Sequence, residues 1–276
     1  LVGVSYTVDR YVRTAEELAE SLVDPEAARR RREERAEEFE KPPKAQNILR
    51  YASLERPKRE VFEHIKADAE RRDPQHKRPL AVLLDGAHSL RTLAVATFSG
   101  VWTTVYLILD IIHVSQYLWD IANTVYGQGT SEARQWVQVK LTEILKGHVG
   151  YVIGGLRQML QKHKLKESQR VPIAKAITYF TNHREMMHYD EYLAAGLPVA
   201  TSLAESTCGL VKHRMEGMGK RWGIPGAEAI LTLRSLSMSH ENDLPDFVRF
   251  RAQREKARLY DERPSFTPQS ELPLVA

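Results

Sequence analysis

The sequence predicts a mixed α/β fold that becomes helical after its first third. Two apolar runs lie at residues 80–86 and 105–113, and in each the apolar stretch leads into an aspartate, Asp85 or Asp110. Runs of this kind are typical of buried strands in a parallel or mixed sheet. The helical run His88–Ala96 between them predicts a right-handed strand–helix–strand unit. From about Val114 onward the apolar spacing is helical. The chain therefore holds either two domains or one α/β core interrupted by a helical insertion, with later helices returning to the sheet.

Composition excludes several classes of protein. The chain has 276 residues, of which 42% are hydrophobic and 28% charged, as in ordinary globular proteins. The single cysteine, Cys208, excludes an internal disulfide framework and a thiolate zinc cluster, so a reducing cytoplasm is expected. The longest apolar run, about Val101–Ile112, is too short for a bilayer span of about 20 residues. The net charge of +4 is compatible with a polyanionic partner.

The first third carries clear start signals. Leu1–Val8 alternates like a half-buried strand and begins without methionine, which predicts that the chain is a fragment. Thr14–Glu17 has capping-box spacing, and Pro25 fits the first position of a second helix. Arg29–Arg32 on that helix suggest either a solvated face or nucleic-acid contact, although glutamates follow them. Lys58–Arg72 is an amphipathic helix.

The remaining helices are delimited by glycine and proline. Gly196-Leu-Pro198 is a stop, and we expect the tail 261–276 to be disordered. The expected helices are Ser131–Lys146, His148–His163, Val171–Asn182, Glu185–Leu193, Ser202–Met215, Ala227–Met238 and Leu244–Tyr260.

Three acidic residues and one histidine are candidates for chemistry. Asp85 and Asp110 would lie at the carboxyl ends of strands, where α/β sheets bind ligands, and carboxylates suit magnesium. The alternative is that Asp85-Gly86 is a turn and Asp110 caps the next helix. His113, three residues on, is either a ligand or a structural histidine. By local pattern Glu205 is best explained as the glutamate of a capping box that starts at Ser202.

A basic cluster follows, near a glycine-rich turn. Such a cluster with a terminal aromatic suits phosphates and a stacked base, although a solvated helix face with the tryptophan in the core fits equally well. No phosphate loop, Gly-x-Gly-x-x-Gly or Gly-x-Ser-x-Gly motif is present, which argues against nucleotide-dependent transferases and serine hydrolases. The cluster comprises Lys212, His213, Arg214, Lys220, Arg221 and Trp222.

Several long stretches resemble bacterial insertion-sequence transposases of the Kra type. The longest is Tyr-Phe-Thr-Asn-His-Arg-Glu-Met-Met-His-Tyr-Asp-Glu-Tyr-Leu-Ala-Ala-Gly-Leu-Pro at 179–198. Residues 2–9, 147–157, 208–217 and 226–234 are also similar to that family, in order along the chain.

The resemblance implies a DDE transposase with an RNase H-like α/β core interrupted by an all-α insertion. Asp85 then matches the second catalytic aspartate and Glu205 the catalytic glutamate, both as metal ligands. Asp110 and His113 match a supporting Asp-x-x-His signature. The first catalytic aspartate would lie upstream of residue 1, and Asp9 does not match it.

The implied organisation has four parts: a partial core (1–113), the insertion (114–196), the returning core with the glutamate helix (197–240), and a C-terminal helix and tail (241–276). Two Mg²⁺ or Mn²⁺ ions about 4 Å apart would support cleavage and transfer of DNA strands. The implied partners are DNA, both element ends and target, and other copies of the chain on that DNA. A bacterial, nucleoid-associated location is expected.

The sequence also departs from the family. Ala200-Thr201-Ser202 replaces a Gly-Ser-Gly before the glutamate, and Gly217-Met-Gly-Lys-Arg-Trp222 replaces a related Gly-Ser-Gly-Met-Arg-Trp. With one metal ligand absent, we expect the fragment to be inactive alone, as a truncated or decaying copy. The rival functions are a non-catalytic DNA-binding remnant and, less favoured, a two-carboxylate hydrolase.

Overall fold

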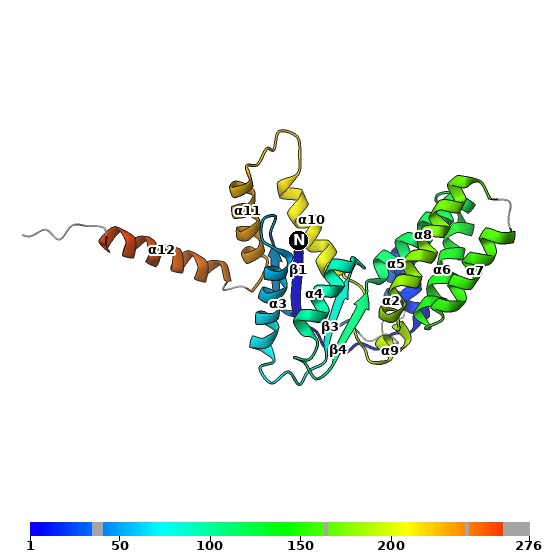
Figure 1. Ribbon diagram of the computed structural model, residues 1–276, viewed down its shortest axis with the longest axis horizontal. Helices are drawn as coiled ribbons and strands as arrows, with labels where there is room; N and C mark the ends of the chain where they lie inside the picture. The colour runs from blue at the N-terminus through cyan, green and yellow to red at the C-terminus, as the bar shows by residue number, and fades with distance from the viewer. Residues whose placement is uncertain (35–40, 163–164, 241–242, 262–276) are drawn as a thin grey trace, which may run out of the picture.

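The computed structural model describes residues 1–34, 41–162, 165–240 and 243–261; within these ranges, the side chains of 162, 210–212, 214 and 261 are not described. The fold is mixed α/β and mostly helical (Figure 1). The predicted α/β class is therefore confirmed at this level.

The chain opens with an antiparallel strand pair. Strand β1 (Val2–Thr7) matches the strand expected at Leu1–Val8. It pairs with β2 (Gln46–Ala52), a strand that was not predicted from the sequence. The predicted capping box at Thr14 starts α1 (Ala15–Val23), and Pro25 begins α2 (Pro25–Glu34). Both helix starts are confirmed.

The predicted strand–helix–strand unit follows helix α3 (Lys58–Arg72). Strand β3 (Leu80–Leu84) and strand β4 (Val105–Leu109) pair in parallel, with α4 (His88–Phe98) between them in sequence. Helix α3 packs on β1, β2 and α4, and α4 packs on β3 and β4, so one helical layer covers both strand pairs.

Strand β3 is less buried than its apolar sequence predicted. Only Leu84 is fully buried, whereas residues 80–83 are half-buried. Leu80 N donates to Thr104 O and Asp110 N donates to Leu84 O, both at 2.9 Å. The backbone N–H and C=O groups of the even-numbered residues of β3 therefore face β4. The other edge, at Ala81 and Leu83, pairs with no strand in the described part of the chain. The half-burial of β3 is explained by this missing neighbour.

Strand β1 also has an open edge. Leu1 and Ser53 exchange two backbone hydrogen bonds of 2.8 and 3.1 Å. The backbone N–H and C=O groups of the odd-numbered residues of β1 therefore face β2. The edge at Val2, Val4 and Tyr6 has no partner strand among the described residues.

The outer edge of β4 is closed by side chains instead. The hydroxyl of Tyr189 donates to Leu109 O at 2.7 Å, and that of Tyr192 donates to Leu107 O at 3.3 Å. Both tyrosines lie on α9 (Tyr189–Ala194), and Tyr189 is completely buried. The helical part of the chain therefore seals this side of the sheet.

The helices between β4 and α10 pack together beyond β4 (Figure 1). Their apolar faces join the sheet residues and α1 in one continuous core, and α1 itself packs against α6. They are α5 (Ile111–Tyr126), α6 (Ser131–Leu145), α7 (Val149–Lys162), α8 (Glu167–His183), a short 3₁₀ helix (Arg184–Met186) and α9.

The chain then returns to the sheet. Ile111 N donates to Val199 O at 3.0 Å, beside the point where the helical segment began. Helix α10 (Ser202–Met215) packs on β1, and α11 (Ile224–Ser237) packs on β2. Helix α12 (Asp243–Asp261) contacts α11 and projects away from the body (Figure 1). Of the tail 261–276, which was expected to be disordered, Asp261 ends α12 and residues 262–276 lie outside the described part.

Across the described ranges, no helix combines the length and apolar character required to cross a membrane.

A buried ion pair attaches α3 to β1. Asp68 is 2% exposed and accepts from Arg72 at 2.7 Å, while Arg72 donates to Thr7 at 2.9 Å and to the hydroxyl of Ser5. We predict that Asp68→Ala lowers the free energy of unfolding in urea by about 3 kcal/mol, because Arg72 is left buried without its counter-ion. Glu33→Ala, which breaks the exposed pair with Arg29 at the same helical spacing, is the control and should cost about 0–1 kcal/mol. Equal losses would contradict the prediction.

Candidate functional site

Asp110 is the centre of the candidate site. It follows β4 directly, is 0% exposed, and caps α5, with Oδ1 accepting from Ile112 N at 3.0 Å. The same Oδ1 accepts from Thr201 N at 3.1 Å, and Oδ2 accepts from the Thr201 hydroxyl. The capping alternative is therefore confirmed, but the carboxylate also binds the returning chain. The bonds to Thr201 also show that the backbone at 200–202 approaches Asp110 closely, although this segment lacks the glycines found in the family.

His113 lies one helical turn after Asp110 on α5. Its Nδ1 lies 3.1 Å from Oε1 of Gln116. Its Nε2 lies 3.9 Å from Oδ2 of Asp110 and 3.8 Å from Oε1 of Glu205. Nε2 therefore faces two carboxylates, to which it offers an N–H when it is protonated and a lone pair when it is not.

Glu205 faces this pair from α10. Helix α10 begins at Ser202, and Glu205 N donates to Thr201 O at 2.8 Å, so Ser202 is the first helical residue and not the capping one. A capping box needs its glutamate three residues after the cap, and Glu205 is one position too far. The capping-box interpretation is wrong, and the 48% exposed carboxylate lies beside His113 instead.

Asp110, His113 and Glu205 together could hold a cation. One ligand atom from each lies within 4.8 Å of the other two. Two carboxylates beside an imidazole lone pair repel one another unless a proton or a metal ion lies between them. Carboxylates and imidazole are ligands of divalent metals, with Mn²⁺ tolerating this mixture better than Mg²⁺.

Asp85 is not a member of this group of three, although it ends the neighbouring strand. It lies one residue beyond the last paired residues, Leu84 and Leu109, as Asp110 does. Its Oδ1 accepts from Ala87 N at 2.8 Å, and Gly86 has a φ of +89°, so the predicted Asp85-Gly86 turn is confirmed. The residue is exposed, so its carboxylate remains accessible to a ligand.

Two side chains of α8 reach the Asp85 turn. Tyr179 donates to Asp85 O at 2.8 Å, and Nε2 of His183 lies 2.7 Å from Gly86 O. Burial raises the pKa of Tyr179, and the negative charges of Asp85 and Asp110 add to this effect. Tyr179 therefore remains a hydrogen-bond donor at neutral pH. The sequence did not indicate a role at the site for Tyr179, His183 or Thr201, because the groups that they contact are distant in sequence.

The predicted DNA-binding cluster is partly described. Lys220 and Arg221 are exposed, and Lys220 Nζ donates to carbonyls of His213 and Glu216 at 3.2 and 3.1 Å. Trp222 is 42% exposed and donates to Met215 O at 3.0 Å, so the alternative that placed it in the core is wrong. Lys212 and Arg214 lie on α10, but their side chains are outside the described part.

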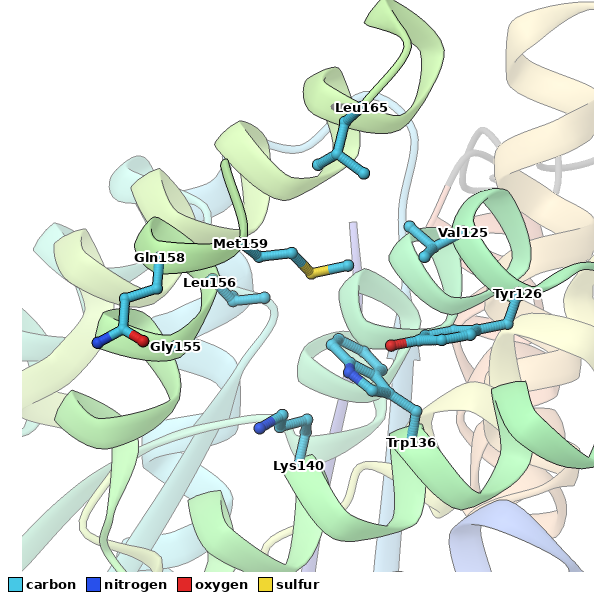
Figure 2. Close-up of a pocket in the computed structure, with 9 residues that line it drawn as sticks. All are labelled: Val125, Tyr126, Trp136, Lys140, Gly155, Leu156, Gln158, Met159 and Leu165. Atoms are coloured by element: carbon cyan, nitrogen blue, oxygen red, sulfur yellow. The ribbon is translucent and has the colours of Figure 1, made fainter. Parts of the chain in front are cut away.

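Two hollows lie on the helical part. One of about 360 Å³ is lined by apolar and aromatic side chains such as Trp136 and Met159, with Lys140 at its edge (Figure 2). Its lining contains no carboxylate or histidine, so it is not the site of the predicted chemistry. The other, of about 430 Å³, is lined by Tyr117, Tyr179 and His183 among others, so it adjoins the Asp85 turn.

Comparison with protein-family models, curated proteins and solved structures found no match to this chain. The resemblance described above therefore stays a prediction that rests on its motifs.

The bond from the Thr201 hydroxyl to the buried Asp110 should contribute measurably to stability. We predict that Thr201→Val lowers the free energy of unfolding by about 1.5–3 kcal/mol, because a buried charged acceptor loses its donor. Ser206→Ala, on the exposed side of the same helix, should change it by less than about 0.5 kcal/mol. Denaturant unfolding of the two variants measures the difference. A loss for Thr201→Val no larger than that of the control would contradict the assigned role.

Proposed function

We propose that this chain is part of a metal-dependent DDE transposase that transfers phosphoryl groups on DNA. The observation that supports this most directly is the return of Glu205, after a long helical segment, to the ends of two parallel strands. There it meets Asp110 and His113, next to the strand that ends in Asp85.

The open strand edges support an RNase H-like core. Strands β1 and β3 each have one edge without a partner strand in the described ranges, and α3 and α4 cover both pairs in one layer. One additional strand between β1 and β3 would join the two pairs into a single sheet.

The proposed roles follow from how each carboxylate is used. Asp85 is exposed and Glu205 is half-exposed, so both can turn toward a metal ion. Asp110 already accepts three hydrogen bonds, from Ile112 N and from the backbone and hydroxyl of Thr201. Two of these bonds are to Oδ1 and one is to Oδ2, so Oδ2 keeps a lone pair for a cation while the carboxylate holds the start of α10 in place. Bound Mg²⁺ or Mn²⁺ would activate water or a 3′-hydroxyl for attack on a phosphate.

Basic side chains support DNA as the substrate. Lys220, Arg221 and Trp222 form an exposed turn after α10. Helix α12 adds an arm on which five basic residues face solvent, two of them in ion pairs with acidic residues of the same helix. Phosphate contacts of this kind give affinity without sequence specificity. The basic residues of α12 are Arg249, Arg251, Arg254, Lys256 and Arg258.

The metal site is tested by Mn²⁺ binding, followed by electron paramagnetic resonance or calorimetry. We predict that the chain binds Mn²⁺ and that Glu205→Gln or His113→Gln weakens the affinity at least tenfold, because a ligand is lost. Glu216→Gln, an exposed glutamate at the end of α10, is the control and should leave the affinity unchanged. We also predict no robust Mn²⁺-dependent nicking of plasmid DNA by this chain alone, because Asp85 is not among the three residues whose ligand atoms lie together. Equal affinities in all variants would refute the metal site, and robust nicking would refute the need for another ligand.

A non-catalytic DNA-binding protein is the second candidate. It is favoured by the structural roles of both strand-end aspartates, since Asp85 forms a turn and Asp110 caps a helix. If the double variant Asp85→Asn/Glu205→Gln binds DNA as wild type does, and the wild type binds Mn²⁺ no better than the variant, this candidate replaces the transposase.

DNA binding itself should depend on α12. We predict that Arg251→Gln/Arg254→Gln weakens binding to duplex DNA and makes the slope of log K against log salt shallower by about 2, as expected for two lost phosphate contacts. Arg29→Gln, which removes an exposed arginine that is paired with Glu33, should leave the slope unchanged. Fluorescence anisotropy over a salt series measures both. Equal slopes for the two variants would remove α12 from the DNA surface.

A further inference from the structure

The turn at Asp85 is held from outside its own strand. Tyr179 O–H donates to Asp85 O at 2.8 Å, across 94 residues of sequence. Gly86 has a φ of +89°, and a Cβ at that position would lie 2.6 Å from the Tyr179 hydroxyl oxygen. Gly86 is therefore needed both for the backbone conformation and for the close approach of the tyrosine.

His183 makes a second link, one helical turn further along α8. Its Nε2 lies 2.7 Å from Gly86 O and its Nδ1 2.7 Å from Tyr179 O. Both partners are carbonyl oxygens, which only accept. The neutral ring therefore donates to one of them, and only the doubly protonated ring donates to both the turn and its own helix.

Aromatic packing keeps Tyr179 in place. Its ring stacks on Tyr117 of α5, with centroids 4.2 Å apart and an angle of 20° between the planes, and it also contacts the ring of His183. Tyr179, which donates to the Asp85 carbonyl from α8, is therefore also held by packing against α5.

We propose that Tyr179 and His183 are positioning residues that hold the Asp85–Gly86 turn, so that the seating of the helical insertion determines where the Asp85 carboxylate lies. An exposed turn can satisfy its carbonyls with water. Two ordered side chains from a distant helix replace that water here, which couples the turn to α8. The link to metal binding rests on the proposed function, whereas the link to the turn does not.

The test uses hydrogen exchange by NMR at the Ala87 amide, which donates to Asp85 Oδ1 and so reports on the turn. Tyr179→Phe keeps the stacked ring and removes the hydroxyl, and His183→Phe removes both nitrogens. We expect each variant to exchange this amide about tenfold faster, the effect of one hydrogen bond of ordinary net strength. Thr178→Ala, whose hydroxyl donates to Ala174 O within α8, is the matched control and should not change the exchange.

A second readout separates positioning from general stability. We expect Tyr179→Phe to weaken Mn²⁺ binding several-fold while the midpoint of urea unfolding stays close to that of the control. His183→Gln keeps an N–H donor and should recover part of the slow exchange that His183→Phe loses.

Unchanged exchange at Ala87 in both the Tyr179 and His183 variants would overturn the proposal. Faster exchange in a protein that binds no Mn²⁺ even as wild type would leave the positioning role intact and refute the proposed function.

Discussion

The structure depends on how one buried carboxylate is satisfied. Asp110 is completely buried at the end of a strand, and a charge in that position is costly unless donors surround it. Its donors come from both ends of the helical segment: Ile112, where the segment begins, and Thr201, where the chain returns 91 residues later. Asp110 therefore fastens the entry and the exit of the insertion to the same point of the sheet.

This attachment explains why Asp110, His113 and Glu205 lie close together. Helix α5 begins next to Asp110, which places His113 one turn away, and α10 begins next to Thr201, which places Glu205 opposite. The two carboxylates and the imidazole nitrogen repel one another unless a positive charge, either a proton on His113 or a bound cation, lies between them.

The two strand-end aspartates have separate tasks as a result. Asp110 is buried and accepts three hydrogen bonds, whereas Asp85 is exposed on a turn whose carbonyls are contacted by Tyr179 and His183. Asp85 follows β3, whose outer edge pairs with no strand in the described part of the chain.

Patterns that act over a few residues are enough to predict most of the local elements. Capping at Thr14, Pro25 at a helix start and the two apolar strands follow from spacing and turn chemistry. Strand β2 is not predicted, because its pattern is weak and its partner β1 lies far upstream.

Contacts between distant segments do not follow from local patterns. The local pattern at Glu205 fits a capping box, whereas the folded chain places this side chain beside His113. The bonds of Thr201 to Asp110, and of Tyr179 and His183 to the Asp85 turn, likewise form only in the folded chain. These contacts join segments roughly 90 residues apart, and a local pattern has no information about which distant backbone will supply the partner of a buried polar group.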